Sequence, residues 1–271
     1  MSFIYDGREE SGYVIGRFHI LGVNMSDRYM RIPSKSMGRS VHLWCYGHFG
    51  PPVVVFPSAA GFAHEWQQQG MIDMLRPLLH AGKLKLYCPE SNVAQAWTKK
   101  EGTLEERMEH HSRYEQFILN ELTAFIAEDC HLPDPPLQAI GCSLGAMYAA
   151  NFALKYPKRF RRAICMSGRY LTTALTDGQD SSSLYFNNPL AYVPNLQGEA
   201  LDMVRKNTQL TLICGKGAYE EGCIEETIAL SRVLQRKGIP CHVDIWGKDS
   251  KHDWGWWKRQ ANMYMRHYFV G

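Results

Sequence analysis

Residues 137–156, LQAIGCSLGAMYAANFALKY, decide how this chain folds. The apolar run LQAIGC predicts a buried strand, and the run from Leu144 onward predicts a buried helix. Between them stands the pattern G-x-S-x-G, with Gly141, Ser143 and Gly145 at the turn from strand to helix. Side chains two residues before and after the serine would collide in so sharp a turn, which explains glycine at both places. The sequence therefore predicts that the Ser143 hydroxyl stands clear of the sheet, beside the backbone N–H of Leu144.

Short apolar runs separated by helical stretches continue on both sides of this turn. Runs of this length, buried on both faces, are typical of a parallel sheet that helices cover. The predicted strands are VVVF (53–56), KLKLYC (83–88), LQAIGC (137–142), AICMS (163–167), TLIC (211–214) and HVDIW (242–246). The predicted helices span residues 66–81, 103–128, 144–155, 221–237 and 255–268.

Two segments depart from this alternation of strand and helix. Residues 1–50 alternate as antiparallel strands do, with Val41, Leu43 and Cys45 on one face. Residues 170–207 are rich in Ser, Asp, Asn, Gly and Pro, and we expect an irregular insertion over the carboxyl edge of the sheet, where α/β proteins bind ligands. The prediction is one α/β domain over residues 1–271, with a mostly parallel central sheet, helices on both faces and an antiparallel N-terminal β entry.

Composition and charge exclude several classes of protein. Hydrophobic residues make up 45% of the 271 residues and charged residues 21%, which excludes disorder. A net charge of +3 is too small to predict a nucleic-acid partner. No apolar run is long enough to predict a membrane span, and residues 1–12 lack the pattern of a signal peptide. The eight cysteines are scattered, mostly through apolar segments, which favours free thiols and a cytoplasmic location.

A histidine in a late loop can supply the base that such a serine needs. For a serine on this kind of turn the partners follow in the order serine, acid, histidine, and the histidine comes from a loop after the last strand. His252 lies in that loop, after HVDIW. We expect His252 to act as general base toward Ser143, while Asp253 and Trp254 shape the loop.

The acid should follow the preceding strand, TLIC, and hold the imidazole in the correct tautomer. The segment GKGAYEE (215–221) offers Glu220, the first choice, and Glu221, the second. Glu225 and Glu226 stand behind them in the predicted helix. All four carboxylates could instead serve the N-terminus of that helix, so the assignment between Glu220 and Glu221 stays open.

A second backbone N–H is needed to hold a developing oxyanion together with Leu144. It is expected in the small-residue loop that follows VVVF, where the backbone can approach a substrate closely. Ala59 is the predicted donor, with Ser58 and Ala60 as its alternatives.

Five stretches carry a resemblance to a known family. They are YGHFGPPVVVFP (46–57), RMEHHSRYEQFILNEL (107–122), IGCSLGAMYAANFALKYP (140–157), YFNNPLAYVPNL (185–196) and HDWGWW (252–257). Over most of its length the chain resembles the prokaryotic putative-esterase family, which is related to esterase D, S-formylglutathione hydrolases and mycolyltransferases. The resemblance implies an α/β-hydrolase fold, a Ser-Glu/Asp-His triad, no cofactor, and acyl esters or thioesters as substrates. GKGAYEE departs from it, because many relatives place an aspartate sooner after the glycine.

Together these observations predict a serine hydrolase that cleaves small carboxylic esters through an acyl-enzyme, with Ser143 as nucleophile, His252 as base and Glu220 as acid. Two alternatives stay open. One is an acyltransferase or thioesterase with the same triad, and the other is a non-catalytic binding protein on the same fold. No metal is predicted, because adjacent His110 and His111 diverge on a helix and no other pair has ligand spacing. A homo-oligomer stays open as well.

Overall fold

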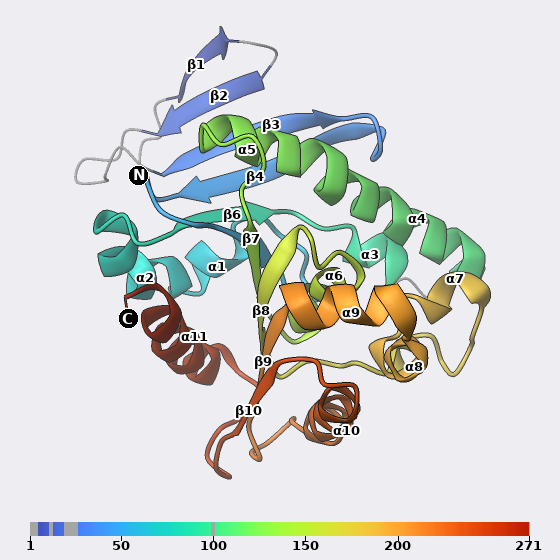
Figure 1. Cartoon of the computed structure of the whole chain (residues 1–271). Helices are drawn as coiled ribbons and strands as arrows, with labels where there is room; N and C mark the ends of the chain where they lie inside the picture. Colours follow the sequence, from blue (N-terminus) through green and yellow to red (C-terminus); the bar gives the residue numbers. More distant parts are fainter. Residues whose placement is uncertain (1–4, 11–12, 19–26, 99–100, 271) are drawn as a thin grey trace.

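Six neighbouring strands run parallel, so their carboxyl ends share one edge of the sheet. The computed structural model describes residues 5–10, 13–18, 27–98 and 101–270. Within that part, ten strands form one sheet in the order β1-β2-β3-β4-β6-β5-β7-β8-β9-β10 (Figure 1). Strands β1 to β4 pair antiparallel and β4 is antiparallel to β6, whereas β6, β5, β7, β8, β9 and β10 are parallel. The strands are β1 (Tyr5–Glu10), β2 (Tyr13–Phe18), β3 (Arg28–Ser34), β4 (Arg39–Tyr46), β5 (Pro52–Phe56), β6 (Lys85–Pro89), β7 (Leu137–Cys142), β8 (Phe160–Met166), β9 (Gln209–Cys214) and β10 (Cys241–Ile245).

Helices cover both faces of the sheet. One hydrophobic cluster joins α1, α2 and α11 through Trp66, Leu75 and Trp257. A larger cluster on the other face includes Tyr114 of α4 and Tyr148 of α6. The helices are α1 (Glu65–Gln68), α2 (Met71–His80), α3 (Val93–Ala96), α4 (Leu104–Gln116), the π-helix η1 (Phe117–Leu122), α5 (Thr123–Asp129), α6 (Leu144–Lys155), the 3₁₀-helix η2 (Thr172–Leu175), α7 (Ser182–Tyr185), α8 (Pro189–Tyr192), the 3₁₀-helix η3 (Val193–Asn195), α9 (Gly198–Asn207), α10 (Cys223–Arg236) and α11 (Trp254–Phe269). No helix in the described ranges is both long and apolar enough to cross a bilayer.

All six predicted apolar runs are strands, and the predicted helices lie between them. The helix expected over 66–81 is divided, because Gly70 has a φ of 73° between α1 and α2. The helix expected over 103–128 begins at a capping box between Thr103 and Glu106 and contains the π-helical segment η1. The sequence prediction thus located these elements but missed where they break.

The N-terminal strands show the predicted alternation where side chains are described. Val41, Leu43 and Cys45 are buried in the larger hydrophobic cluster. Tyr46 is also buried, against the other face, where its hydroxyl donates to Gln67 at 3.0 Å. Residues 1–4 and 11–12, part of the segment considered for a signal peptide, lie outside the described residues.

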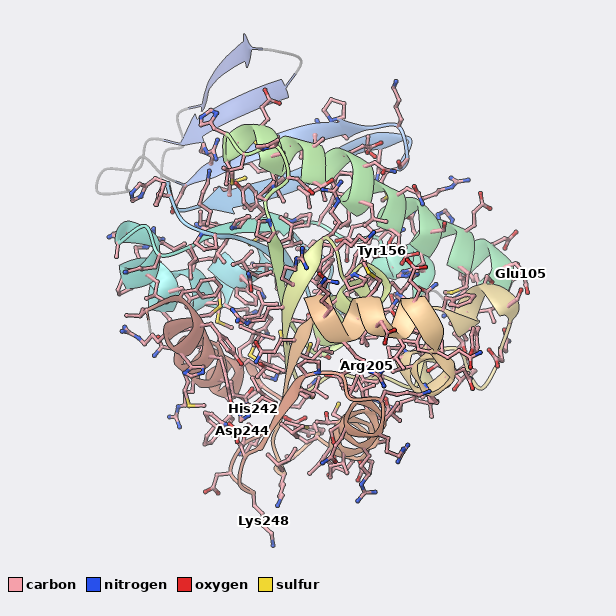
Figure 2. The ribbon with its side chains drawn as sticks, viewed as in Figure 1. Glu105, Tyr156, Arg205, His242, Asp244 and Lys248 are labelled. Carbon is pink, nitrogen blue, oxygen red and sulfur yellow. The ribbon has the colours of Figure 1, made fainter. Side chains whose placement is uncertain are left out.

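The edge strand β10 is fastened to α11. His242 and Asp244 lie on β10 (Figure 2), and the Tyr264 hydroxyl of α11 is 3.0 Å from His242 Nε2 and 2.8 Å from Asp244 Oδ2. Asp253 caps α11 by accepting the Trp256 N–H at 3.1 Å. Both ends of the loop between β10 and α11 are therefore held.

The segment 170–207 is more regular than the sequence predicts. It contains short helical turns and ends in α9, which has ten residues. Glu226 of α10 anchors its start by accepting from the N–H groups of Tyr170 and Leu171 and from Arg169. The helix α9 covers the last ten residues of the segment and was not among the predicted helices, while an insertion over the carboxyl edge of the sheet stays a prediction.

A buried polar network attaches this segment to the helices beneath it. His111 of α4 is fully buried, and its Nε2 lies 3.1 Å from Asn187 Oδ1. The same oxygen accepts from Asn151 at 3.0 Å and from Lys155 at 2.9 Å, both on α6. His111 Nδ1 is buried without a partner among the described residues. His111 therefore packs in the core and holds Asn187 in position.

We expect His111 to destabilise the protein as the pH falls. Burial lowers the pKa of His111 from its ordinary value to about 4, although nearby Glu115 opposes the shift. The folded state then binds this proton more weakly than the unfolded state, so the contribution of His111 to stability is lost below pH about 6.5. Between pH 7 and pH 5 this residue should lower the free energy of unfolding by about 2 kcal/mol. His111→Gln keeps an N–H donor but does not titrate, so urea unfolding of this variant should lack the loss of about 2 kcal/mol between pH 7 and pH 5. An equal pH dependence of the free energy of unfolding in the variant and the parent would contradict the prediction.

Candidate active site

The turn at Ser143 has the strained backbone that the sequence predicts. Ser143 has φ 55° and ψ −123° between β7 and α6. A Cβ on Gly141 would lie 2.3 Å from the backbone of Gly145, and a Cβ on Gly145 would lie 2.3 Å from the Phe56 carbonyl oxygen. Both glycines are therefore sterically required, and the second also brings the start of α6 against the end of β5.

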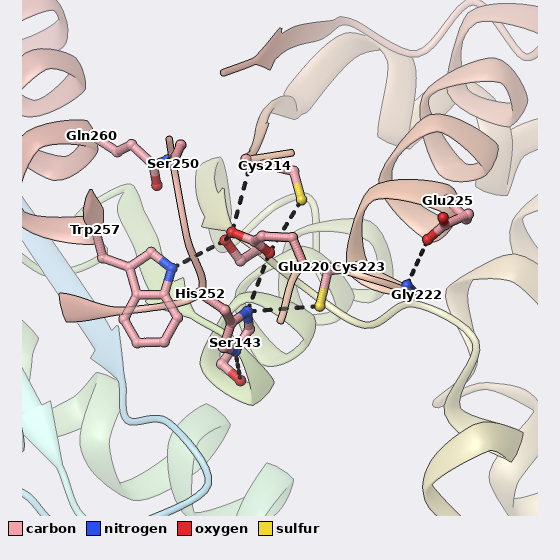
Figure 3. Close-up of polar contacts among 12 residues, drawn as sticks. Ser143, Cys214, Glu220, Gly222, Cys223, Glu225, Ser250, His252, Trp257 and Gln260 are labelled. Carbon is pink, nitrogen blue, oxygen red and sulfur yellow. Dashed lines mark hydrogen bonds and ion pairs between the residues drawn. The ribbon is translucent and has the colours of Figure 1, made fainter. Parts of the chain in front are cut away.

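Three predicted side chains meet at the carboxyl edge of the sheet (Figure 3). His252 Nε2 lies 3.0 Å from Ser143 Oγ, and His252 Nδ1 lies 3.2 Å from Glu220 Oε2. They come from the ends of β7, β9 and β10, which explains how residues so far apart in sequence can meet. The result is a continuous chain of polar contacts from serine to imidazole to carboxylate.

Backbone bonds between two loops hold the acid beside the histidine. The loop after β9 and the loop after β10 are joined by Gly217 N–H to the Ser250 carbonyl at 2.8 Å and His252 N–H to the Ala218 carbonyl at 3.0 Å. Trp257 packs edge-on against His252, with the ring centroids 4.7 Å apart. The position of His252 is thus fixed by its backbone hydrogen bond to Ala218 and by the ring of Trp257.

Burial distinguishes the two glutamates that the sequence left open. Glu220 is 1% exposed, whereas Glu221 is exposed at the surface. Glu225 accepts the Gly222 N–H at the start of α10, and Glu226 holds the segment that begins at residue 169. Of the four carboxylates, the structure brings Glu220 to His252, and the last two do structural work.

Ser167 joins this site, although the sequence analysis gave it no role. It follows β8, has a φ of 52° and is fully buried. Its hydroxyl donates to Glu220 Oε1 at 2.6 Å and accepts from Trp257 Nε1 at 3.0 Å. The one available signal was its place as the last residue of the predicted strand AICMS (163–167). Ser167 therefore positions the carboxylate on the side away from the imidazole.

Ser167→Ala should lower kcat/KM for an ester. Without the hydroxyl donor, the Glu220 carboxylate loses the contact that holds it on the side away from the imidazole. A displaced supporting group can lower a rate by up to about 100-fold, and we expect a loss of that order in the initial rate of p-nitrophenol release. An unchanged kcat/KM would contradict the assignment of Ser167 as a positioning residue.

One backbone amide of the loop after β5 is free to face a substrate oxygen. The Ser58 N–H donates to Glu65 at 2.7 Å, and the Ala60 N–H lies 3.4 Å from Ser58 Oγ. The Ala59 N–H has no acceptor among the described residues. Of the three amides considered, that of Ala59 alone lacks an acceptor in the described part of the chain, so Ala59 stays the predicted donor.

Glu65 is the buried residue that holds this loop. It is 5% exposed and accepts from both the N–H and the hydroxyl of Ser58, the latter at 2.5 Å. Burial raises the pKa of Glu65, while the two bonds from Ser58 oppose the shift. The sequence analysis gave Glu65 no role, because this role depends on contacts that spacing does not reveal.

The thiols near the site are unreactive in their present form. Cys142 is fully buried, and burial raises its pKa well above the usual range, as expected for the last residue of a strand. Cys223 lies with its Sγ 3.9 Å from His252 Nδ1, and burial raises the pKa of Cys223 to about 12. Within the described residues, Glu220, Cys223 and His252 form the one group of three side chains whose atoms could hold a metal ion.

The arrangement can perform nucleophilic chemistry at an acyl carbon. An imidazole that accepts from a hydroxyl can take its proton, and a buried carboxylate can stabilise the imidazolium that results. Two backbone N–H groups are available for a developing oxyanion. The catalytic roles of Ser143, His252, Glu220, Leu144 and Ala59 stay predictions.

Comparisons with known proteins show the family and the fold of the chain. The model of a family described as Putative esterase matches residues 34–267. An S-formylglutathione hydrolase from Staphylococcus aureus is similar in structure, with a TM-score of 0.67, 15% identity, and coverage of 91% of this chain and 96% of that one. An S-formylglutathione hydrolase from Agrobacterium tumefaciens has a TM-score of 0.69, 12% identity and full coverage of both chains.

A ferulic acid esterase from Anaeromyces mucronatus is also similar, with a TM-score of 0.64, 14% identity, and coverage of 93% of this chain and 92% of that one. These likenesses confirm the expected α/β-hydrolase fold. No curated protein has significant sequence similarity to the chain.

Proposed function

The chain belongs to the putative-esterase family and is a carboxylic ester hydrolase, and we propose that it works through Ser143, His252 and Glu220 with an acyl-enzyme intermediate. One observation carries the proposal. It is the unbroken chain of contacts from Ser143 Oγ to His252 Nε2 at 3.0 Å and from His252 Nδ1 to Glu220 at 3.2 Å.

The proposed reaction has two halves. Ser143 Oγ attacks the acyl carbon while His252 Nε2 takes its proton, and the N–H groups of Leu144 and Ala59 hold the oxyanion. His252 then gives that proton to the leaving alcohol. Water attacks the acyl-enzyme with His252 again as base and releases the carboxylic acid. Glu220 keeps Nδ1 protonated, so that Nε2 is free to accept.

Hydrolysis of a series of p-nitrophenyl esters from acetate to octanoate tests this proposal. The full chain should hydrolyse at least one member far faster than buffer alone, and a pre-steady-state burst of p-nitrophenol should accompany acyl-enzyme formation. Hydrolysis of none of them, with the fold intact by circular dichroism, would contradict the proposal for activated esters of this kind.

The same acyl-enzyme could be attacked by an alcohol or thiol instead of water, which would make the protein a transferase. Product analysis with and without a small alcohol separates the two reactions. A hydrolase yields mainly the free acid in both cases. A new ester or thioester as the main product at low acceptor concentration would favour transfer.

A further inference from the structure

Three atoms of kinds that bind metals lie close together at the edge of the His252 ring that faces away from Ser143 (Figure 3). They are His252 Nδ1, Glu220 Oε2 and Cys223 Sγ, all within 4.8 Å of one another. The nitrogen is 3.2 Å from the oxygen and 3.9 Å from the sulfur, and both pairs have hydrogen-bond geometry. The carboxylate and the thiol therefore both lie on the side to which Nδ1 points.

The nitrogen–oxygen and nitrogen–sulfur separations are close to those of a tetrahedral zinc site, and the oxygen and the sulfur lie within 4.8 Å of each other. Zinc binds imidazole nitrogen and carboxylate oxygen at about 2.0 to 2.1 Å and sulfur at about 2.3 Å, which places ligand atoms about 3.3 to 3.6 Å apart. Shifts of a few tenths of an ångström would bring the nitrogen–oxygen and nitrogen–sulfur pairs to these values, and the sulfur and the oxygen would close around the ion as it binds. A set of nitrogen, sulfur and oxygen suits zinc, whereas calcium and magnesium prefer oxygen ligands.

The three ligands are held in place before any ion arrives. Ser167 donates to the other oxygen of Glu220, and Cys223 is the first residue of α10, directly after Gly222 with its φ of 80°. His252 is tied through its own N–H to Ala218 and is half-buried, whereas Glu220 and Cys223 are buried, so an ion would have to enter from the side of the imidazole. Three protein ligands leave the fourth position for water.

We propose that Glu220, Cys223 and His252 form an inhibitory zinc site that switches off the ester hydrolysis proposed above. Metal binding forms Zn–S, Zn–N and Zn–O bonds. The S–H and Nδ1–H bonds break, and the imidazole takes up a proton at Nε2, so one proton is released to solvent overall and nothing is oxidised or reduced. With Nε2 protonated, His252 donates to Ser143 Oγ and can no longer accept its proton. This inference rests on the proposed roles of Ser143 and His252.

Zinc titration of esterase activity tests the inhibition. A chelator should restore the activity. For each variant, the rate with zinc is compared with the rate of the same variant without metal. Loss of a residue that only hydrogen-bonds to a metal ligand weakens metal binding by about 10- to 100-fold. Cys223→Ser removes a ligand itself, so it should raise the half-inhibitory zinc concentration at least about 100-fold. Cys223→Ala should do the same. Cys241→Ala, which removes a half-buried thiol next to His242, is the matched control and should be inhibited as the parent is.

Cobalt binding without substrate separates this inference from the proposed function. The parent and Ser143→Ala should both show the near-ultraviolet absorption of a thiolate bound to Co²⁺, and Cys223→Ser should lack it. Equal zinc inhibition of Cys223→Ser and the parent, or no thiolate band in the parent, would overturn the site. A chain that binds cobalt through Cys223 but hydrolyses no ester would keep the metal site and contradict the proposed function instead.

Discussion

Ser143→Ala should lower kcat/KM for an activated ester by about 10³- to 10⁶-fold. The substitution removes the atom that attacks the acyl carbon, while the amides of Leu144 and Ala59 and the substrate pocket remain. Residual activity would then come from oxyanion stabilisation and binding alone. The measurement is the initial rate of p-nitrophenol release, together with the intact mass after mixing with substrate.

Mass spectrometry makes this test specific for the nucleophile. The parent should gain the mass of one acyl group at residue 143 during turnover, and Ser143→Ala should not. The strained backbone is equally open to alanine, so the variant should keep its fold. Ser182→Ala, at an exposed serine of α7, is the control and should retain the parent rate. Equal rates in Ser143→Ala and the parent would remove the serine-hydrolase mechanism.

Glu220→Gln should lower kcat by about 10³- to 10⁴-fold. In the proposed mechanism the carboxylate keeps the proton of His252 on Nδ1, whereas an amide in the same place can present an N–H to that nitrogen and favour the wrong tautomer. The carboxylate also stabilises the imidazolium that forms in the first step, which an uncharged amide cannot do to the same degree.

Glu221→Gln is the matched control for this prediction. The two glutamates are adjacent in sequence, but Glu221 is exposed whereas Glu220 is buried and hydrogen-bonded. We expect Glu221→Gln to change kcat by less than about twofold, as for a surface substitution. A large loss in Glu221→Gln with little effect in Glu220→Gln would reverse the choice of acid.

The fold was largely predictable because its signals are local. Buried parallel strands read as short apolar runs, and the turn at Ser143 requires two glycines within five residues. Breaks within helices were less visible, since Gly70 and the π-helical segment interrupt runs whose apolar spacing continues across them. The helix α9 was missed because the polar residues before it dominate the composition of its segment.

The site was predictable where chain order constrains it and not elsewhere. Ser143 and His252 could be found because each follows a strand in a fixed order. Ser167 and Cys223 could not, since their partners come from distant loops, and the role of Glu65 toward nearby Ser58 depends on burial and contact. The choice between Glu220 and Glu221 also needed the structure, because the sequence does not show which of two adjacent loop residues faces the histidine.

The strand that leads to His252 is one of the two edge strands of the described sheet, since β10 pairs with β9 alone. Edge strands with half-exposed side chains open locally at lower free energy than central ones. Mild heat or denaturant would therefore separate His252 from Ser143 while the central strands stay folded. A preparation can then keep its full helical spectrum after its activity has gone, so functional half-life and melting temperature are different properties of this protein.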